Sequence, residues 1–389
     1  MKVAIIGDRG IPARYSGFST LVEELAVRLV RTHGMQVSVY CRSSYYDDKP
    51  REYEGVRCIY LPSPGGKSFE SIVHSNLAIL HASMDSYDLA FIVDPGNAPF
   101  SWPLMLRRVP TVFHTDGLGW QREKWSPTQK RYYRWSEKVC AKAASWLVTD
   151  SRAMQDYYRE QYGAPSSFIP YSGEVGLPPD DSCLDRHGLE RKGYYLVVAR
   201  VEPENNIDLI IREYRAANLS RPLVIVGGAR YESAYSQSIF SQSDESVRCL
   251  GAIFESAELN GLYENCYAYL HGHEVGGTNP SLLRAMHAGV ACVPIDVVFH
   301  REVMGEEGTF FSKASGELSG TLRKLDVDSE RISELGRLAR ERSASLYRWD
   351  AVAAGYAELF ERILRARKDR VSCREALSDE VYRPWEFGP

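Results

Sequence analysis

The stretch KVAIIGDRGIPARYSGFSTLVEELAVRLVRTHGMQVSVYCR, residues 2–42, decides the fold class of this chain. It starts with an apolar run of strand length, passes through a loop with three glycines, and then shows the 3.6-residue periodicity of an amphipathic helix. Thr20 and Glu23 fit a capping box at the helix start, and Gly34 fits the helix end. Residues 36–42 form a second apolar run. This order of strand, loop, helix and strand predicts a parallel sheet in an α/β domain.

The same alternation continues along the chain and restarts once. The first series continues with the strand candidates VRCIYLP, YDLAFIVD, VPTVFHTDG, SWLVTDS and SSFIPYS. After the polar stretch GLPPDDSCLDRHGLERKG, a second series begins with YYLVVAR and continues with PLVIVGG, VRCLGAI, AYLHGH and VACVPID. We therefore predict two doubly wound α/β domains, residues 1–172 and 173–350. The helical residues 351–389 follow the last strand, and we expect them to pack back on the first domain.

The composition is that of a soluble globular protein, with 44% hydrophobic and 25% charged residues. A formal net charge of -4 gives no indication of a nucleic-acid partner. The eight cysteines are scattered singly, which argues against a zinc site and favours buried free thiols in a reducing compartment. The first apolar run is too short for a signal peptide, and no run is long enough to cross a membrane. We expect a cytoplasmic protein.

Ligands of doubly wound sheets bind where the strands end, so the loops after the strands are the places to look for chemistry. The loop GDRGIPARYSGF, residues 7–18, can present backbone amides to an anion, although an ordinary glycine turn is the alternative. Its glycines lack the GxGxxG spacing, which argues against a nucleotide-dependent oxidoreductase.

Two further loops carry polar side chains at strand ends. His114 and Asp116 are two residues apart, so they point the same way and can orient a substrate hydroxyl or assist proton transfer. The alternative is that Asp116 merely starts a turn. Arg200 ends the first strand of the second series and suits a bidentate grip on phosphate. Glu204 and the two asparagines after it can instead cap the next helix.

The stretch HEVGGTNPSLLRAMHAG, residues 273–289, has the form of a glycine turn that feeds a helix. Asn279 suits the N-cap, Pro280 suits the first helical position, and the amides of the first turn suit a diphosphate. Arg284 lies about one turn into this helix, where the dipole disfavours a cation. It therefore either meets an anion or points into solvent.

His271 and His273, which lie just before the glycine turn, fit either core packing or a ligand contact. The segment at residues 120–146 interleaves basic and aromatic side chains. Such a mixture suits an anionic membrane interface, and the alternative is a solvated helix face with its aromatics in the core.

With these residues in view, the whole chain resembles the retaining family-4 glycosyltransferases of GT-B fold. It is most similar to the bacterial rhamnosyltransferases of polysaccharide synthesis. The stretches that carry the resemblance are GDRGIPARYSGFSTLVEEL, VYCR, GNAPF, DGLGWQREKW, SFIPYS, ARVEPENN and HEVGGTNPSLLRAM. The resemblance implies that the second domain binds a nucleotide-sugar, the first binds the acceptor, and the last helix crosses back to the first domain. It also implies that no metal is needed, because helix ends and an arginine neutralise the diphosphate.

The resemblance also implies roles for individual residues. His114 and Asp116 become the catalytic pair, which positions the donor sugar or the acceptor. The acceptor-binding residues are then Arg14, Tyr15, Trp120 and Arg122. The donor-binding residues are Gly17, Arg200, Asn205, Gly276, Gly277, Thr278, Asn279, Ser281 and Arg284.

Some positions depart from the family pattern. Gly276 and Arg284 stand where the broader family has two glutamates, and the second of these glutamates contacts the nucleotide ribose. Ser16 and Ser19 make the loop SGFST rather than GGFET, and Gly119 makes DGLGW from DGLEW. These changes lie near the expected site, so they concern the identity of the donor rather than the fold.

We therefore expect a retaining hexosyltransferase that moves a sugar from a nucleotide-diphosphate donor to a glycan or lipid-linked acceptor in cell-surface polysaccharide synthesis. A deoxysugar donor such as dTDP-rhamnose is preferred, because a deoxyribose has one hydroxyl fewer to satisfy. The alternatives are a catalytically inactive nucleotide-sugar or glycan-binding homologue and a sugar-nucleotide epimerase of the same fold. We expect no nucleic-acid partner, and we expect peripheral contact with an anionic membrane at its inner face.

Overall fold

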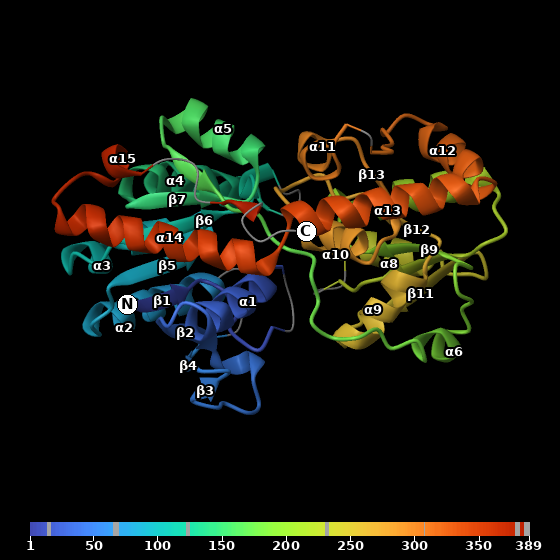
Figure 1. Ribbon diagram of the computed structural model, residues 1–389. Coiled ribbons are helices and arrows are strands. Elements are labelled where there is room, and N and C mark those ends of the chain that lie inside the picture. The colour runs from blue at the N-terminus through green and yellow to red at the C-terminus, as the bar shows by residue number, and fades with distance from the viewer. Residues whose placement is uncertain are drawn as a thin grey trace. The chain divides into compact units, whose positions relative to one another are not determined.

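The computed structural model describes residues 1–13, 17–64, 70–121, 125–229, 233–306, 308–377 and 382–384. The chain forms two compact units, which are described here one at a time (Figure 1). The first unit comprises Met1–Gln121, Trp125–Tyr171 and Trp349–Phe387, and the second contains Ser172–Arg348. Both ends of the chain therefore contribute to the first unit.

The first unit is built on an eight-stranded sheet with the order β3-β4-β2-β1-β5-β6-β7-β8. Every pair is parallel except the hairpin of β3 with β4. The strands are β1 (Lys2–Ile6), β2 (Gln36–Arg42), β3 (Glu52–Tyr53), β4 (Val56–Leu61), β5 (Leu89–Val93), β6 (Thr111–Thr115), β7 (Trp146–Thr149) and β8 (Ser166–Phe168).

The helices of the first unit are α1 (Gly17–Arg31), α2 (Glu70–Met84), α3 (Trp102–Leu106), α4 (Pro127–Ala143), α5 (Arg152–Tyr162), α14 (Trp349–Lys368) and α15 (Cys373–Ala376), with 3-10 turns η1 (Ser43–Tyr45), η2 (Pro95–Phe100) and η3 (Gly119–Gln121). The predicted end of α1 is confirmed, because Gly34 adopts a φ of 62° and its amide donates to the Val30 carbonyl. The predicted capping box is wrong, since α1 begins at Gly17 and Thr20 lies inside it. Glu23 instead accepts a 2.9 Å hydrogen bond from the Tyr53 hydroxyl.

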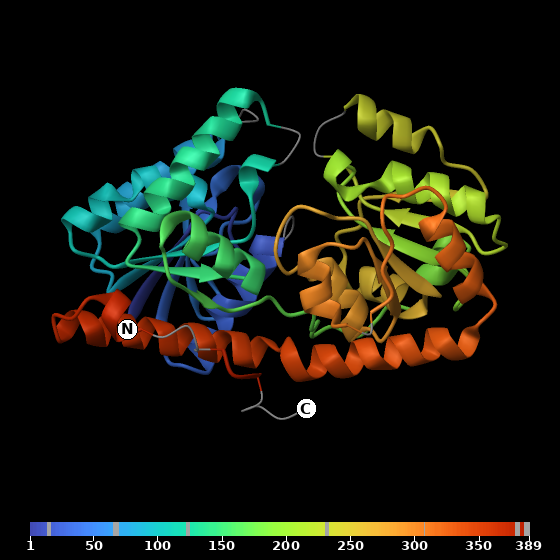
Figure 2. The same cartoon turned by 90° about the horizontal axis from the view of Figure 1, so that it is seen from above.

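Helix α14 completes the core of the first unit. It packs against α1, and its Tyr356 and Phe360 rings lie 5.1 and 5.9 Å from the ring of Phe91 in β5. Figure 2 shows α14, in red, along one face of the sheet. All three rings are fully buried, so this helix is part of the first unit's hydrophobic core.

The second unit has a five-stranded parallel sheet with the order β11-β10-β9-β12-β13. Its strands are β9 (Tyr195–Val198), β10 (Leu223–Val226), β11 (Val247–Gly251), β12 (Ala268–His271) and β13 (Ala291–Pro294). Its helices are α6 (Cys183–His187), α7 (Ile207–Ala217), α8 (Ala234–Phe240), α9 (Ser256–Asn265), α10 (Pro280–His287), α11 (Val298–Met304), α12 (Glu317–Asp326) and α13 (Ser329–Leu346), with the 3-10 turn η4 (Pro203–Asn205).

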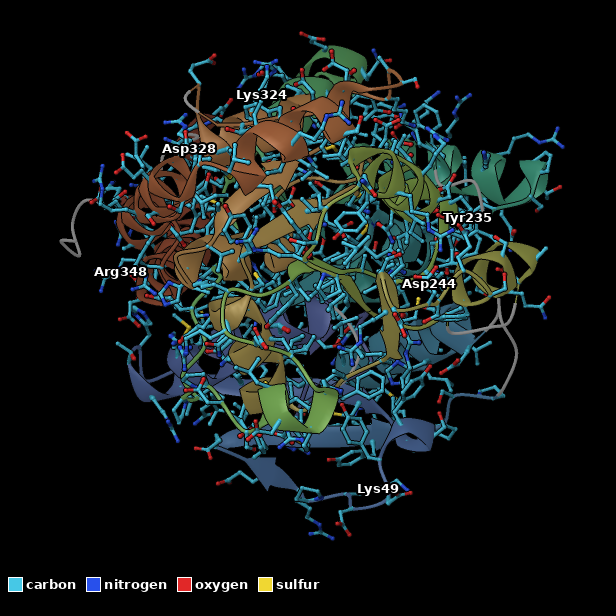
Figure 3. The ribbon with its side chains drawn as sticks, turned by 90° about the vertical axis from the view of Figure 1, so that its right-hand side faces the viewer. Lys49, Tyr235, Asp244, Lys324, Asp328 and Arg348 are labelled. Carbon is cyan, nitrogen blue, oxygen red and sulfur yellow. The ribbon has the colours of Figure 1, made fainter. Side chains whose placement is uncertain are left out.

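Surface contacts fix the outer helices of the second unit. The Tyr235 hydroxyl on α8 donates a 2.8 Å hydrogen bond to Asp208 of α7 (Figure 3). Asp328, also labelled in Figure 3, caps α13 by accepting from the Arg331 amide at 2.9 Å. The Asp328 bond satisfies one of the amides at a helix start that have no intrahelical partner, whereas the Tyr235 bond joins the first turns of two helices.

All twelve strands predicted from the sequence are present, which confirms the two doubly wound sheets. The two-residue strand β3 and the short helix α3 were not predicted, because neither is long enough to show a periodicity. The eight cysteines are free thiols, and six of them are buried, as expected. Within the described part of the chain, the helices lack the length and apolar character that a bilayer span requires.

Candidate functional site

The strand order of the second unit reverses between β9 and β12, which is the position where doubly wound sheets bind ligands. Two loops meet there: one follows β9 and carries Arg200, and the other follows β12 and leads into α10. The Asn206 side chain donates to the Gly272 carbonyl at 2.8 Å, and the Glu274 amide donates to the Glu204 carbonyl at 3.1 Å. The fold thus brings together two loops that the sequence separates by about seventy residues.

The loop after β9 is held in shape by its own asparagines. The Asn205 side chain donates to the Arg200 carbonyl at 2.6 Å, and its other end contacts His273 Nδ1 at 2.5 Å. Asn206 occupies the N-cap position of α7 but forms no side-chain cap. The predicted capping role of the asparagines is therefore wrong, because their amides are used to join the two loops. Arg200 itself is exposed at this edge.

Glu204 was considered only as a helix cap in the sequence analysis, and the structure gives it a different environment. Its side chain is buried, and neither carboxylate oxygen has a hydrogen-bond partner among the described residues. Buried polar groups normally have such partners. The capping interpretation is therefore wrong for Glu204 as well. The loop after β9 is unusual in that it buries a carboxylate without such a partner.

The loop after β12 and the start of α10 agree with the sequence. Gly276 adopts a φ of 143°, which favours glycine. Asn279 caps α10 by accepting from the Ser281 amide at 3.1 Å and from the Ser281 hydroxyl at 2.7 Å, and Pro280 is the first helical residue. The cap uses one amide of the first turn. Gly277 and Thr278 are buried just before the cap, so this loop is closely packed.

Arg284 lies in a different electrostatic position from the one predicted. Helix α10 has only eight residues, so Arg284 is in its last turn, where the dipole favours a cation. Its guanidinium donates to Asn260 Oδ1 at 2.5 and 2.8 Å and to the Ser256 carbonyl at 2.7 Å, both on α9. It also lies over the Tyr263 ring at 5.5 Å. The interpretation as a solvent-facing arginine is wrong, because the side chain ties α10 to α9.

The two histidines at the end of β12 have separate roles. His271 is buried, its Nδ1 contacts the Tyr269 hydroxyl at 2.9 Å, and its ring lies 4.9 Å from that of His300. Burial holds the pKa of His271 well below its ordinary value, so it packs as a neutral core side chain. His273 contacts Asn205 and belongs to the junction of the two loops.

Two glycines allow the backbone of these loops to come close, and neither was singled out in the sequence. A Cβ on Gly272 would lie 2.3 Å from the Asn205 carbonyl oxygen. A Cβ on Gly227, after β10, would lie 1.7 Å from the Ala199 carbonyl oxygen, next to Arg200. Their signal was present, because each glycine directly follows a predicted strand.

In the first unit, His114 lies on β6 within an aromatic environment. Its ring lies 5.5 Å from Phe18 and 5.6 Å from Tyr171, both edge to face. It is fully buried, and burial lowers its pKa to about 3. His114 is therefore neutral near pH 7. It can donate or accept a hydrogen bond, but it carries no positive charge and cannot act as an imidazolium acid.

An aspartate follows each of four neighbouring strands in the first unit, β1, β5, β6 and β7: these are Asp8, Asp94, Asp116 and Asp150. Burial raises the pKa of Tyr171 well above its usual range, and the nearby charges of Asp116, Asp150 and Asp8 raise it further. Only Asp116 was singled out from the sequence. Within the described residues, no group of His, Cys, Asp or Glu is arranged to hold a metal ion.

The remaining predicted residues are placed as follows. Gly17 is the first residue of α1, and Trp120 lies in η3 with the Arg134 guanidinium 4.0 Å from its ring centre. Arg14, Tyr15 and Arg122 lie outside the described residues. These acceptor-binding assignments stay predictions.

The basic and aromatic segment of residues 120–146 includes α4. Most of its aromatic side chains pack against protein: the Tyr132 hydroxyl donates to the Gly96 carbonyl at 2.7 Å, and Trp146 is buried on β7. Trp135 remains exposed. Few aromatic side chains therefore accompany the basic side chains of α4 on the surface, where a membrane could meet them.

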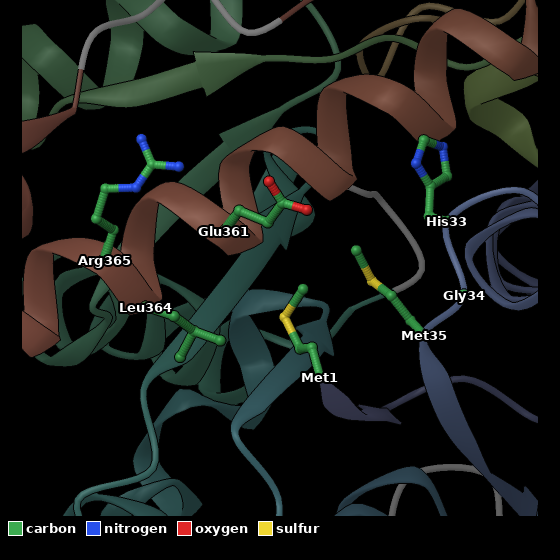
Figure 4. A pocket seen from close by; sticks show the side chains of 7 residues that line it. All are labelled: Met1, His33, Gly34, Met35, Glu361, Leu364 and Arg365. Carbon is green, nitrogen blue, oxygen red and sulfur yellow. The ribbon is translucent and has the colours of Figure 1, made fainter.

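A pocket of about 370 Å³ lies between the end of α1 and helix α14 (Figure 4). Its lining residues are Met1, His33, Gly34, Met35, Glu361, Leu364 and Arg365. Met1 and Met35 directly precede β1 and β2, so the pocket is at the amino ends of the strands. It contains none of the predicted site residues and lies at the edge opposite to the one where such sheets bind ligands.

Two family models match the chain. Residues 1–174 match a model described as a domain of unknown function, DUF1972, and residues 192–325 match the model described as glycosyl transferases group 1. No curated protein sequence matches.

Several solved structures resemble the whole chain. Sucrose-phosphate synthase from Thermosynechococcus elongatus has a TM-score of 0.80 at 17% identity, covering 94% of this chain and 99% of that one. Anabaena HepE in complex with UDP and glucose has a TM-score of 0.74 at 15% identity, covering 93% and 99%. WaaG, a glycosyltransferase involved in lipopolysaccharide biosynthesis, has a TM-score of 0.68 at 14% identity, covering 92% and 99%. The predicted α/β fold of GT-B type is confirmed.

Proposed function

We propose that this protein, whose fold is of GT-B type and whose residues 192–325 match the glycosyl transferases group 1 model, transfers a sugar from a nucleotide-diphosphate donor to a glycan or lipid-linked acceptor. The observation that carries the proposal is the junction of the loops after β9 and β12, with the capped start of α10 beside it. The likeness to HepE structures that contain UDP and UDP-glucose supports a donor of this chemistry.

In this proposal the second unit holds the diphosphate. Arg200 and the first-turn amides of α10 neutralise the charge that grows on the leaving group, which is the largest electrostatic task of the reaction. We propose retention through a front-face route: the bond from the anomeric carbon to the diphosphate breaks, the acceptor oxygen bonds on the same face, and the acceptor proton passes to the leaving phosphate. The charge is assigned to protein groups, so the proposal includes no resident metal.

His114 and Asp116 are proposed to position the donor sugar or the acceptor. A neutral imidazole can donate one hydrogen bond and accept another, and a carboxylate accepts from hydroxyl groups. The further carboxylates at the strand ends of the first unit, Asp8 and Asp150, fit an acceptor rich in hydroxyl groups.

We propose a deoxysugar nucleotide such as dTDP-rhamnose as donor. The position where relatives use a carboxylate on ribose holds Arg284, which donates hydrogen bonds only. A guanidinium offers a ribose hydroxyl no acceptor, and this one already donates to Asn260 and Ser256 of α9. A deoxyribose loses less from this change than a ribose does.

The test is nucleotide release with a panel of UDP-, GDP- and dTDP-sugars and a glycan acceptor, together with a thermal-shift screen of the same nucleotides. A ligand at 100 times its Kd adds about 2.7 kcal/mol of stability. Arg200→Ala should abolish the shift, whereas Arg212→Ala, an exposed arginine on α7 of the same unit, should not. Absence of both binding and turnover with every donor would contradict the proposal.

A second candidate is a nucleotide-sugar-binding homologue without catalysis. Arg284 in place of a carboxylate motivates it. Saturable nucleotide binding that is lost in Arg200→Ala, with no sugar transfer to any acceptor, would favour this candidate over the enzyme.

A lipid-linked acceptor would bring the protein to a membrane, and we propose peripheral contact with an anionic lipid surface. The basic side chains of α4 support this proposal, and the exposed ring of Trp135 is in keeping with it.

A further inference from the structure

Two neighbouring helices of the first unit, α2 and α3, expose several large apolar side chains to solvent. On α2 these side chains follow helical spacing i, i+3 and i+7, and on α3 they follow i, i+3 and i+4, so each set forms one stripe. We call the set the α2–α3 apolar face; it consists of Leu77, Leu80, Met84, Trp102, Met105 and Leu106.

The two stripes belong to one surface. Helices α2 and α3 pack against each other, and they lie next to each other in Figure 1. Their carboxyl-terminal ends also meet, because Leu106 lines a small surface hollow together with Asp85, the residue after Met84. Met84 is 76% exposed and Leu106 74% exposed. A contiguous exposed apolar face of this kind marks an interaction site.

Among the described residues, the charges at the carboxyl-terminal ends of α2 and α3 are mainly positive. Arg107 and Arg108 directly follow the apolar residues of α3, and both are exposed. Asp85 at the end of α2 is paired with two cations, Lys2 at 2.8 Å and Arg57 at 3.4 Å. Asp88, the other acid here, accepts from the Lys2 amide. Four cations thus stand against two carboxylates.

We infer that the α2–α3 apolar face, with its rim of Arg107 and Arg108, docks the protein on an anionic lipid surface. The apolar side chains enter the interface between headgroups and acyl chains, and the guanidinium groups pair with lipid phosphates. A tryptophan at the start of such a stripe suits this boundary, since its ring is apolar and its N–H is polar. This places the membrane contact mainly on α2 and α3, whereas the sequence had suggested the segment around α4.

The inference rests on the proposed membrane contact but not on sugar transfer, so the two are tested separately. We would measure co-sedimentation of the full chain with phosphatidylcholine vesicles that contain or lack phosphatidylglycerol. We expect binding only to the anionic vesicles, and binding should weaken as salt is raised. The double variant Met84→Ser/Leu106→Ser should lower the partition coefficient at least about tenfold, because two large apolar contacts are lost. Arg107→Gln/Arg108→Asn should remove the preference for anionic vesicles.

The matched control is Leu177→Ser/Val327→Ser, which removes two exposed apolar side chains from the second unit. It should bind vesicles like the unaltered protein. Thermal melting of each variant verifies folding, and nucleotide binding in solution should be equal in all of them, so a failure here leaves the proposed sugar transfer standing. Vesicle binding that Met84→Ser/Leu106→Ser leaves unchanged would overturn the inference. A concentration-dependent dimer by light scattering that this variant breaks, without vesicle binding, would show a second copy as the occupant and would also overturn it.

Discussion

Arg284 shows how the neighbours of a side chain decide its role. The sequence presents it as a cation near a helix start, whereas the structure uses it as a clamp between α10 and α9. The length of α10 was the missing information. In a helix of eight residues, a side chain one turn after the start already lies in the last turn.

We predict that Arg284→Glu destabilises the protein by about 2 kcal/mol or more, because a carboxylate would face the Asn260 and Ser256 oxygens without a donor. Chemical denaturation monitored by circular dichroism measures this change. Asn260→Ala should lose less on top of Arg284→Ala than it does alone, since the two side chains are partners. Equal losses in both backgrounds would refute the clamp.

Glu137 on α4 gives the first unit a pH dependence. Burial raises the pKa of Glu137 to about 7, although hydrogen bonds from Tyr157 at 3.1 Å and Tyr162 at 3.3 Å oppose the rise. The folded chain then holds more protons than the unfolded chain between about pH 4.5 and 7. We predict that the contribution of Glu137 to stability falls as the pH rises through this window.

Glu137→Gln keeps both tyrosine donors supplied with an acceptor and removes the titration. As the pH is raised from 4.5 to 8, the denaturation midpoint should fall less, or rise more, in this variant than in the unaltered protein. Parallel slopes in the two proteins would show that Glu137 is not the group responsible.

His114 contributes a pH dependence of the opposite direction. Burial lowers the pKa of His114 to about 3 in the folded chain, whereas in the unfolded chain this side chain binds a proton below about pH 6.5. Its contribution to stability therefore falls as the pH falls. We predict that His114→Phe, whose ring fits beside Phe18 and Tyr171, is more resistant to acid and loses sugar transfer about 100-fold or more. Acid titration of the fold and initial transfer rates measure the two effects. Retained transfer would remove His114 from the site.

At the scale of elements, the junction of the two loops in the second unit depends on backbone contact. We predict that Gly272→Ala weakens nucleotide binding about tenfold or more, because its Cβ would lie 2.3 Å from the Asn205 carbonyl and push the loops apart. Gly320→Ala on α12, where a Cβ meets nothing within 4 Å, is the matched control and should bind normally. Calorimetric titration with nucleotide compares the three proteins; equal affinities would mean that the loops do not bind it.

The elements also show which parts of the structure could be predicted from the sequence. Strands were predictable because buried parallel strands are near-continuous apolar runs. The cap of α10 was predictable because Asn279 and Pro280 act within four residues of chain. The capping roles given to Thr20 and Glu204 failed, because those side chains are governed by partners or burial far away in the sequence. The junction between Asn206 and Gly272 could not be predicted for the same reason.

At the scale of the whole molecule, the sequence showed the two series of strands as a pattern that restarts, and it predicted that residues 351–389 pack on the first domain. The contacts of the Tyr356 and Phe360 rings with Phe91 could not be predicted from it. We predict that Phe360→Ala destabilises the first unit by about 3–5 kcal/mol through loss of a buried ring. Nucleotide binding by the folded protein at low temperature should remain. Denaturation curves and nucleotide titrations measure the two properties, and Phe240→Ala, a half-exposed ring on α8, is the control. If Phe360→Ala lost nucleotide binding but kept normal stability, this would contradict the assignment of Phe360 to the core of the first unit and of nucleotide binding to the second unit.

The first unit's use of both ends of the chain has a consequence for synthesis. A ribosome finishes Met1–Tyr171 early, but the rings of Tyr356 and Phe360 that cover Phe91 emerge only after the entire second unit has been made. Until then, part of the first core has no cover and is open to chaperones or to other nascent chains. The second unit is continuous from Ser172 to Arg348, so it can fold while the first one waits.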